Sequence, residues 1–279
     1  MRNPIEFALN HIAAPHLGSG RRGTDRFFAL ARELGLSKVE IRNDLAGAPT
    51  ADGTPPEVMK DAAEAHGVTI LTINALQRFN EWNERRQSEA VALARYARAC
   101  GAKALVLVPV NDAGFRPSGQ DRREGVREAL RRLKPVLAEN RLMGYVEPLG
   151  FPISSLRSKR EAIEAIDAID GAGIFRLVHD SFHHHLAGET ALYPERTGIA
   201  HISGVADRAI PLASLQDAHR ILVDDGDVLG NLSQIEDLRA GGYRGPFSFE
   251  PFAESVQRAG DLKAKLQASM KFIAEKIAK

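Results

Sequence analysis

Four residues whose side chains can bind a divalent metal follow short apolar runs in the second half of the chain. They are Glu147, Asp180, His201 and Glu250. Three carboxylates that converged on one point would repel one another, and their pKa values would rise unless a cation lay between them. With one imidazole they form a donor set for a single divalent ion, Mn²⁺ or Zn²⁺ first, with Co²⁺ and Mg²⁺ as alternatives. The sequence therefore predicts a metal site if the fold brings the four together, although one carboxylate at a strand end is more often a helix N-cap or a salt-bridge partner.

Further polar residues near predicted strand ends could bind a substrate. His183 comes three positions after the predicted aspartate ligand, so its ring could lean over the same site and bond a substrate oxygen. Arg42 and Asn74 are candidates for binding hydroxyl groups, although Arg42 could equally pair with Glu40 or Asp44.

Three stretches exceed ordinary connections: a Gly/Arg-rich one at 18–23, and two more at 77–86 and 207–230. Loops of this kind often form lids or binding edges, and otherwise they are solvated surface loops. Phe79 and Trp82 in the second stretch could form an apolar wall over a sugar ring or anchor the loop in the core.

Eight short apolar segments alternate with longer ones whose apolar residues recur every three or four positions. The eight predict strands over 5–10, 38–42, 69–75, 104–110, 144–148, 175–180, 199–203 and 246–251. The first four are spaced by about 33 residues, the size of one βα unit. Because β-then-α order predicts a parallel sheet with helices outside, and eight repeats leave little room for a second domain, we expect an α/β fold. It would be a single (β/α)₈ TIM barrel over 1–279, closed by a C-terminal helix over about 254–278, with its site at the C-terminal strand ends.

A doubly wound open sheet is the alternative fold. The first predicted strand is not followed by the Gly-x-Gly-x-x-Gly motif that would support it.

The composition is that of an ordinary globular protein, with 44% hydrophobic and 26% charged residues. The net charge of +1 lacks the basic surplus of proteins that bind phosphate backbones, so we expect no nucleic-acid partner. Cys100 is the single cysteine, which excludes an intramolecular disulfide.

No apolar run approaches the length of about 18 residues that a membrane span needs, so we expect no membrane segment, no signal peptide and a cytoplasmic protein. The C-terminal helix could cap the barrel or join a second copy, which leaves a homo-oligomer open.

The four predicted ligands, in this order, and the Asp-Ser-Phe-His motif at 180–183 resemble the xylose isomerase-like TIM barrel superfamily of sugar isomerases and epimerases. The resemblance covers essentially the whole chain. Within the superfamily, several segments are most similar to the inosose isomerases of inositol catabolism. These segments are 39–44, 72–84, 106–110, 177–188, 200–203 and 247–252.

The resemblance implies that the four predicted ligands hold one divalent metal ion. It also implies that Glu147 and Glu250 act as acid and base, and that His183 binds the substrate. In related epimerases an arginine lies six residues beyond the ligand histidine. Here Asp207 takes that place and Arg208 follows, which makes Arg208 a candidate for substrate binding. The nearby loop reads Val-Asp-Asp-Gly-Asp where relatives commonly have Pro-Gly-x-Gly.

The implied substrate is a small α-hydroxyketone of a cyclic polyol or sugar, and the implied reaction is isomerisation of 2-keto-myo-inositol by proton transfer through a cis-enediolate. The nearest alternatives on the same site are dehydration of an inosose or of 3-dehydroshikimate, hydroxypyruvate isomerisation, and 3-epimerisation of a ketose. Two alternatives of other classes are a metal-dependent abasic-site endonuclease, which shares this fold, and a sugar-binding barrel without catalytic activity.

Overall fold

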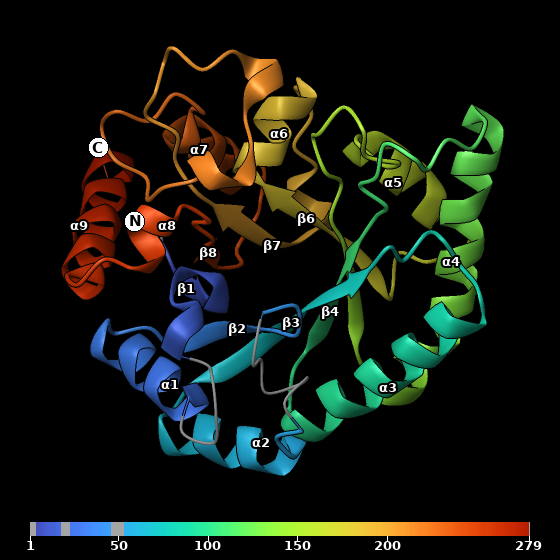
Figure 1. The fold of residues 1–279 in the computed structure, drawn as a ribbon, viewed down its shortest axis with the longest axis horizontal. Helices are drawn as coiled ribbons and strands as arrows, with labels where there is room; N and C mark the ends of the chain where they lie inside the picture. Colours follow the sequence, from blue (N-terminus) through green and yellow to red (C-terminus); the bar gives the residue numbers. More distant parts are fainter. Residues whose placement is uncertain (1–3, 18–22, 46–52, 279) are drawn as a thin grey trace.

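Eight parallel strands pair in sequence order and close into a barrel, because β1 pairs with both β2 and β8 (Figure 1). The computed structural model describes residues 4–17, 23–45 and 53–278, so the Gly/Arg-rich stretch lies outside the described residues except for Gly23. The strands are β1 Phe7–Asn10, β2 Lys38–Arg42, β3 Thr69–Gln77, β4 Ala104–Val108, β5 Met143–Val146, β6 Phe175–Asp180, β7 Thr197–Ile202 and β8 Phe247–Phe249. The prediction of a closed eight-stranded α/β barrel is confirmed, and the open sheet is excluded.

The strand ends differ from the predicted ones by no more than two residues, and β2 and β6 match at both ends. Prolines explain most of the shortening at the C-terminal ends. Pro109, Pro148 and Pro251 follow β4, β5 and β8 closely, and a proline has no N–H with which to continue a strand ladder. Two of these prolines come directly after a glutamate, so Glu147 and Glu250 stand at the rim where the ladder stops.

Helices surround the strands on the outside (Figure 1). They are α1 Gly23–Glu33, α2 Pro56–Ala65, α3 Glu84–Cys100, α4 Gly119–Asn140, α5 Lys159–Asp167, α6 Ser181–Ala187, α7 Asn231–Ala240, α8 Glu254–Gln257 and α9 Leu262–Ile277. Side chains cap several of them: Asn83 and Ser158 accept hydrogen bonds from the first turns of α3 and α5.

The segment predicted as one C-terminal helix contains two, α8 and α9. The helical pattern breaks between them at 258–261, where Gly260 precedes Asp261 at the start of α9. Helix α9 contacts α7, and its Lys263 forms an ion pair with Glu33 of α1.

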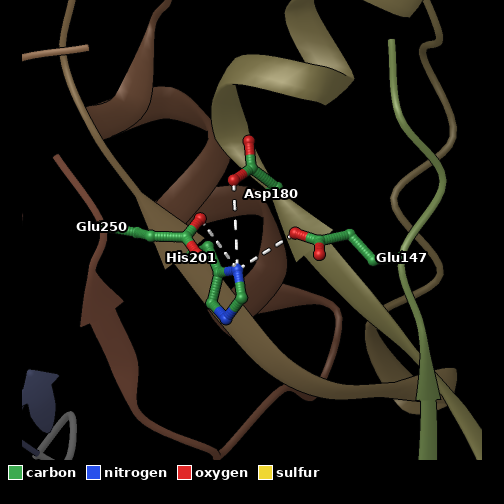
Figure 2. A group of neighbouring side chains, drawn as sticks. All are labelled: Glu147, Asp180, His201 and Glu250. Atoms are coloured by element: carbon green, nitrogen blue, oxygen red, sulfur yellow. Dashed lines mark hydrogen bonds and ion pairs between the residues drawn. The ribbon is translucent and has the colours of Figure 1, made fainter. Parts of the chain in front are cut away.

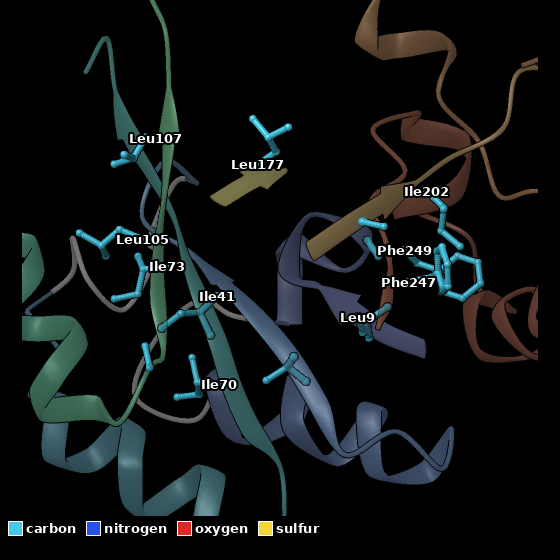
Figure 3. Packing of buried hydrophobic residues seen from close by; sticks show 14 of the residues in the cluster. Leu9, Ile41, Ile70, Ile73, Leu105, Leu107, Leu177, Ile202, Phe247 and Phe249 are labelled. Atoms are coloured by element: carbon cyan, nitrogen blue, oxygen red, sulfur yellow. The ribbon is translucent and has the colours of Figure 1, made fainter. Parts of the chain in front are cut away.

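Alternation along the strands divides the barrel residues into an outer layer, which is apolar, and an inner layer, which is polar only toward the C-terminal ends of the strands. Residues that face the helices are buried and apolar, as Ile41, Ile73, Leu105 and Phe249 illustrate (Figure 3). Their neighbours along each strand point inward. Near the C-terminal ends these inward residues are polar and hydrogen-bonded to one another, whereas deeper in the barrel they are apolar, such as the contacting group Val106, Val178 and Ile199.

No helix within the described ranges combines the length and the apolar character needed to cross a bilayer.

Candidate metal centre

The four predicted metal ligands meet at the C-terminal mouth of the barrel (Figure 2). Each comes from a different neighbouring strand: Glu147 directly after β5, Asp180 as the last residue of β6, His201 in β7 and Glu250 directly after β8. One ligand atom from each lies within 4.8 Å of the others. All four side chains are buried, with exposures of 5% or less. The fold therefore brings together residues as far apart in the sequence as Glu147 and Glu250.

One nitrogen of His201 faces all three carboxylates. Its Nδ1 lies 3.1 Å from Glu147 Oε1, 3.2 Å from Glu250 Oε2 and 4.0 Å from Asp180 Oδ2. A single N–H can bond well to only one of these oxygens. A divalent cation bound by all four atoms would satisfy the three carboxylates together. The geometry and the donor types thus fit the predicted metal ion, and this buried cluster indicates a divalent metal site.

Glu40 of β2 fixes the orientation of the histidine ring. Its Oε2 lies 3.1 Å from His201 Nε2 and accepts a second hydrogen bond, of 2.6 Å, from the hydroxyl of Thr72. When His201 Nε2–H donates to Glu40, the Nδ1 lone pair points at the carboxylate cluster, which is the arrangement commonly seen behind metal-binding histidines. Sequence reasoning placed Glu40 near a strand end but gave it no role at the metal site. The sequence did contain one signal for such a role, because Glu40 is a charged residue between two apolar strand residues, Val39 and Ile41, both of which are buried.

Arg220 is the second residue that sequence reasoning missed. It belongs to the loop between β7 and α7 and is 1% exposed. Its Nη2 donates to Asp180 Oδ2 at 2.6 Å and to Glu250 Oε2 at 2.8 Å. No local pattern marks it, because it reaches the site through a long loop that Ile221 fastens to Gly204 by paired backbone hydrogen bonds.

Arg42 of β2 also contacts the cluster. It forms a bidentate pair with Asp44 at 2.8 and 2.7 Å, and its Nη1 donates to Glu250 Oε1 at 2.8 Å. The predicted alternative of pairing with Asp44 is thus observed, together with a contact to a predicted ligand. Asn10 donates to the same Glu250 oxygen at 3.2 Å.

Burial and neighbouring charges move the pKa values of the site in opposite directions. Burial raises the pKa of Glu147, and the negative charges of Glu250 and Asp180 add to this rise, which the hydrogen bond with His201 only partly offsets. Burial would also raise the pKa of Glu250, but the positive charges of His201, Arg220 and Arg42 bring it well below its ordinary value. For His201, burial would lower the pKa, yet the surrounding carboxylates raise it well above the ordinary value.

The predicted substrate-binding residues are not all at the site. His183 is buried at the start of α6, where its backbone N–H donates to Asp180 Oδ1 at 2.8 Å and its ring packs edge-on against Phe151 and Phe182. Its Nδ1 has no hydrogen-bond partner in the described part of the chain. Asn74 is buried and its amide lies 3.4 Å from Glu40 Oε2.

Arg208, by contrast, lies exposed on the loop after β7, and the structure gives it no contact with the four ligands. The guanidinium that this loop brings to the site comes from Arg220, twelve residues further along, next to the pairing of Ile221 with Gly204. Phe79 is fully buried in the main core, so it anchors its loop as the second alternative predicted, and Trp82 packs partly buried against the same core.

Comparisons with known proteins extend these observations. A family model described as xylose isomerase-like TIM barrel matches residues 28–276. A xylose isomerase domain containing protein from Salmonella typhimurium LT2 is 33% identical over 100% of this chain and 99% of its own, with a TM-score of 0.87. No curated protein matches the chain.

Two more distant structures share the fold. The IOLI protein, solved with a bound zinc atom, is 20% identical, with a TM-score of 0.82 and 98% of each chain covered. The 3-keto-D-glucoside 4-epimerase YcjR from E. coli is also 20% identical, with a TM-score of 0.70, over 96% of this chain and 98% of its own.

Proposed function

Because the chain belongs to the xylose isomerase-like TIM barrel family, we propose that it is a divalent-metal-dependent isomerase of an α-hydroxyketone. The substrate would be a cyclic polyol or a sugar, with 2-keto-myo-inositol as the first candidate. Glu147, Asp180, His201 and Glu250 would hold the metal ion. Zinc and manganese are the ions to test first, since the distant IOLI relative was solved with zinc and the oxygen-rich donor set also suits manganese.

The observation that carries this proposal is the placement of two glutamates around one imidazole nitrogen. Glu147 and Glu250 approach His201 Nδ1 from opposite sides in Figure 2, at 3.1 and 3.2 Å. Two carboxylates that flank one bound substrate can take a proton from one face or carbon and return it to another. A site that only bound sugar would need neither the pair nor this convergence.

The roles of the chain's own groups follow from their contacts. A bound divalent ion would supply a Lewis acid that polarises the substrate carbonyl and acidifies the adjacent C–H bond. One of the two glutamates would remove that proton, the other would deliver a proton to the neighbouring carbon, and the hydroxyl proton of the substrate would pass to the former carbonyl oxygen. Arg42 and Asn10 hold Glu250 in place through its Oε1. The buried Nδ1 of His183, which has no hydrogen-bond partner among the described residues, can accept a hydrogen bond from a substrate hydroxyl.

The charges around the cluster favour an uncharged substrate. Arg42 and Arg220 are the basic side chains that bond to the cluster within the described ranges, and both are engaged by carboxylates. Neither guanidinium is free to bind a substrate carboxylate. An inosose or a simple ketose therefore suits the site better than 3-dehydroshikimate or hydroxypyruvate, which each carry a carboxylate.

The proposal is tested by assaying a panel of inososes and ketoses in D₂O with chelator-treated enzyme reloaded with Mn²⁺, Zn²⁺ or Co²⁺. We expect isomerised product with deuterium at the α carbon. Product spectra also identify the alternatives, because a dehydratase forms an absorbing enone and a 3-epimerase returns an epimeric ketose. An enone as the sole product would replace the isomerase assignment with a dehydratase.

We predict that Glu147→Gln and Glu250→Gln each keep the fold and lower deuterium exchange at the α carbon by at least about 10²-fold, since an acid or base group contributes about 10²–10⁴-fold. The readout is NMR of the substrate in D₂O. Glu254→Gln is the matched control, because Glu254 is exposed and forms an ion pair with Arg258 on the surface, away from the four ligands. Wild-type exchange in either active-site variant would refute the acid–base assignment.

A further inference from the structure

We propose that Arg220 is a built-in counter-charge of the metal centre. Its positive charge weakens metal binding, and in return it lets the centre stabilise the negative charge that develops on an uncharged substrate during the reaction. It would act through Asp180 and Glu250 rather than on the substrate itself. The effect on metal affinity is independent of the proposed function, whereas the effect on rate rests on it.

The guanidinium of Arg220 lies directly against the predicted metal-binding oxygens. Its Nη2 bonds to Asp180 Oδ2 and Glu250 Oε2, which are the same two oxygens that face His201 Nδ1. Arg220 therefore shares oxygens with the predicted metal instead of holding the outer oxygens of the ligands. A positive charge at this place repels a divalent cation and draws electron density from two of its ligand atoms.

Arg220 is not needed to orient these ligands. The other oxygen of Asp180 accepts the backbone N–H of His183 at 2.8 Å. The other oxygen of Glu250 accepts hydrogen bonds from Arg42 and Asn10. Both carboxylates would keep their orientation without Arg220, so its contribution to the site is mainly its charge.

Arg220 cannot readily swing away. Its Nε donates to Ser203 Oγ at 2.9 Å, and its Nη1 lies 3.2 Å from Asp217 Oδ1. The guanidinium lies between the rings of Phe182 and Phe252, with its Cζ 5.0 and 4.6 Å from their centroids. The charge is thus a permanent part of the centre.

Arg220 also balances the charge of the centre. Three carboxylate ligands exceed a divalent cation by one negative charge, and Arg220 supplies one positive charge directly on two of them. Of the remaining buried charges, Glu40 behind the His201 ring and Arg42 on Glu250 offset each other, while Asp44 and Asp217, which are 28% and 44% exposed, are screened by water. A centre near neutrality stabilises a developing enolate-type anion better than a negative centre does.

The test measures metal affinity and turnover of Arg220→Met, Arg220→Gln and Arg220→Lys. We expect both neutral variants to bind Zn²⁺ or Mn²⁺ at least about tenfold more tightly in chelator competition, because a repelling charge is removed. We expect their kcat to fall about 10²-fold with a smaller change in KM, and Arg220→Lys to retain metal affinity near that of the wild type. Asp217→Asn is the control and should change metal affinity by less than about twofold, since exposed ion pairs are weak.

A residue with only a structural role would give the opposite sign. Weaker or unchanged metal binding in a neutral variant that circular dichroism shows to be folded would overturn the proposal. Arg220→Gln, which keeps a hydrogen-bond donor, provides this measurement if Arg220→Met fails to fold. If no substrate is found for the wild type, the proposed function fails, while the affinity measurement still decides the role of Arg220.

Discussion

At the scale of single residues, the candidate site depends as much on the partners of the ligands as on the ligands. His201 is held by Glu40, and Glu250 is held by Arg42 and Asn10. Such partners set the tautomer and direction of each ligand, and so they control the affinity for a metal.

We predict that Glu40→Gln weakens Zn²⁺ or Mn²⁺ binding by about 10–100-fold, because the amide replaces the carboxylate that fixes His201 Nε2–H. The measurement is isothermal titration calorimetry on chelator-treated protein. Glu6→Gln is the matched control, since Glu6 forms an exposed ion pair with Lys38 at the opposite end of the barrel. Equal affinities of wild type and Glu40→Gln would show that Glu40 does not orient the histidine.

The four ligands could be predicted from the sequence because each follows an apolar strand and carries a metal-binding group. Glu40 gave a weaker signal, since an inward-facing charge in a strand can also be a salt-bridge partner. Arg220 could not be found locally. Its place depends on the path of the loop after β7, and a spacing taken from relatives pointed to Arg208, which the structure leaves exposed.

At the scale of elements, α6 is the helix that couples packing to the site. Asp180 caps its N-terminus, and His183 lies in its first turn. Gly150, which follows β5, lies against this helix. A Cβ on Gly150 would overlap the carbonyl oxygen of His183 and lie 2.5 Å from Leu186 Cβ.

We predict that Gly150→Ala lowers the free energy of unfolding by about 1–3 kcal/mol through overpacking and also weakens metal binding, because α6 must shift. Urea denaturation and metal titration measure the two effects. Gly173→Ala is the control, since a Cβ there meets no atom within 4 Å. If Gly150→Ala bound metal as the wild type does, the position of α6 would not be coupled to Asp180.

Helices α5 and α6 are joined by a buried lysine. Lys159, the first residue of α5, lies 2.5 Å from His184 Nδ1, and burial lowers its pKa to about 8. Burial and the nearby Lys159 charge lower the pKa of His184 to about 3, so the histidine is neutral and accepts the hydrogen bond.

We predict that the stability of the wild type rises between about pH 8 and 10.5, partly because of Lys159. In this window the unfolded chain keeps the Lys159 proton while the folded protein has released it, so raising the pH favours the folded state. Lys159→Met should remove a rise on the order of 3 kcal/mol, the equivalent of this pKa shift. Urea denaturation across the pH range provides the measurement, with the exposed Lys60→Met as control. Parallel curves for wild type and Lys159→Met would contradict the assignment.

The elements themselves were largely predictable, because alternation in strands and three-to-four spacing in helices report which face is buried. The errors came from backbone chemistry that the hydrophobic pattern does not contain. Prolines shortened β4, β5 and β8, and the break at Gly260 divided the C-terminal helix into α8 and α9.

At the scale of the whole molecule, the candidate metal centre links four strands at one end of the barrel. Buried carboxylates that repel one another destabilise the folded protein unless a cation binds. Metal binding should therefore act on global stability as well as on catalysis.

We predict that removing the metal with a chelator lowers the melting temperature by about 5–10 °C, since ligand at a hundred times its Kd adds about 2.7 kcal/mol and a domain of this size shifts by about 2–4 °C per kcal/mol. Differential scanning calorimetry before and after reloading with Zn²⁺ or Mn²⁺ checks this. The double variant Asp180→Asn/His201→Gln should melt at the same temperature with and without metal. A wild type that melted identically in both conditions would argue against a metal site.

The division of the site between the two halves of the barrel constrains recombination. All four predicted ligands come from β5–β8, whereas Glu40 and Arg42, which contact His201 and Glu250, come from β2. A chimera joined between β4 and β5 would inherit every ligand from one parent and these supporting residues from the other. We therefore expect such a chimera to keep a working site only when the parent that supplies β2 carries residues at positions 40 and 42 that fit the ligands of the other parent.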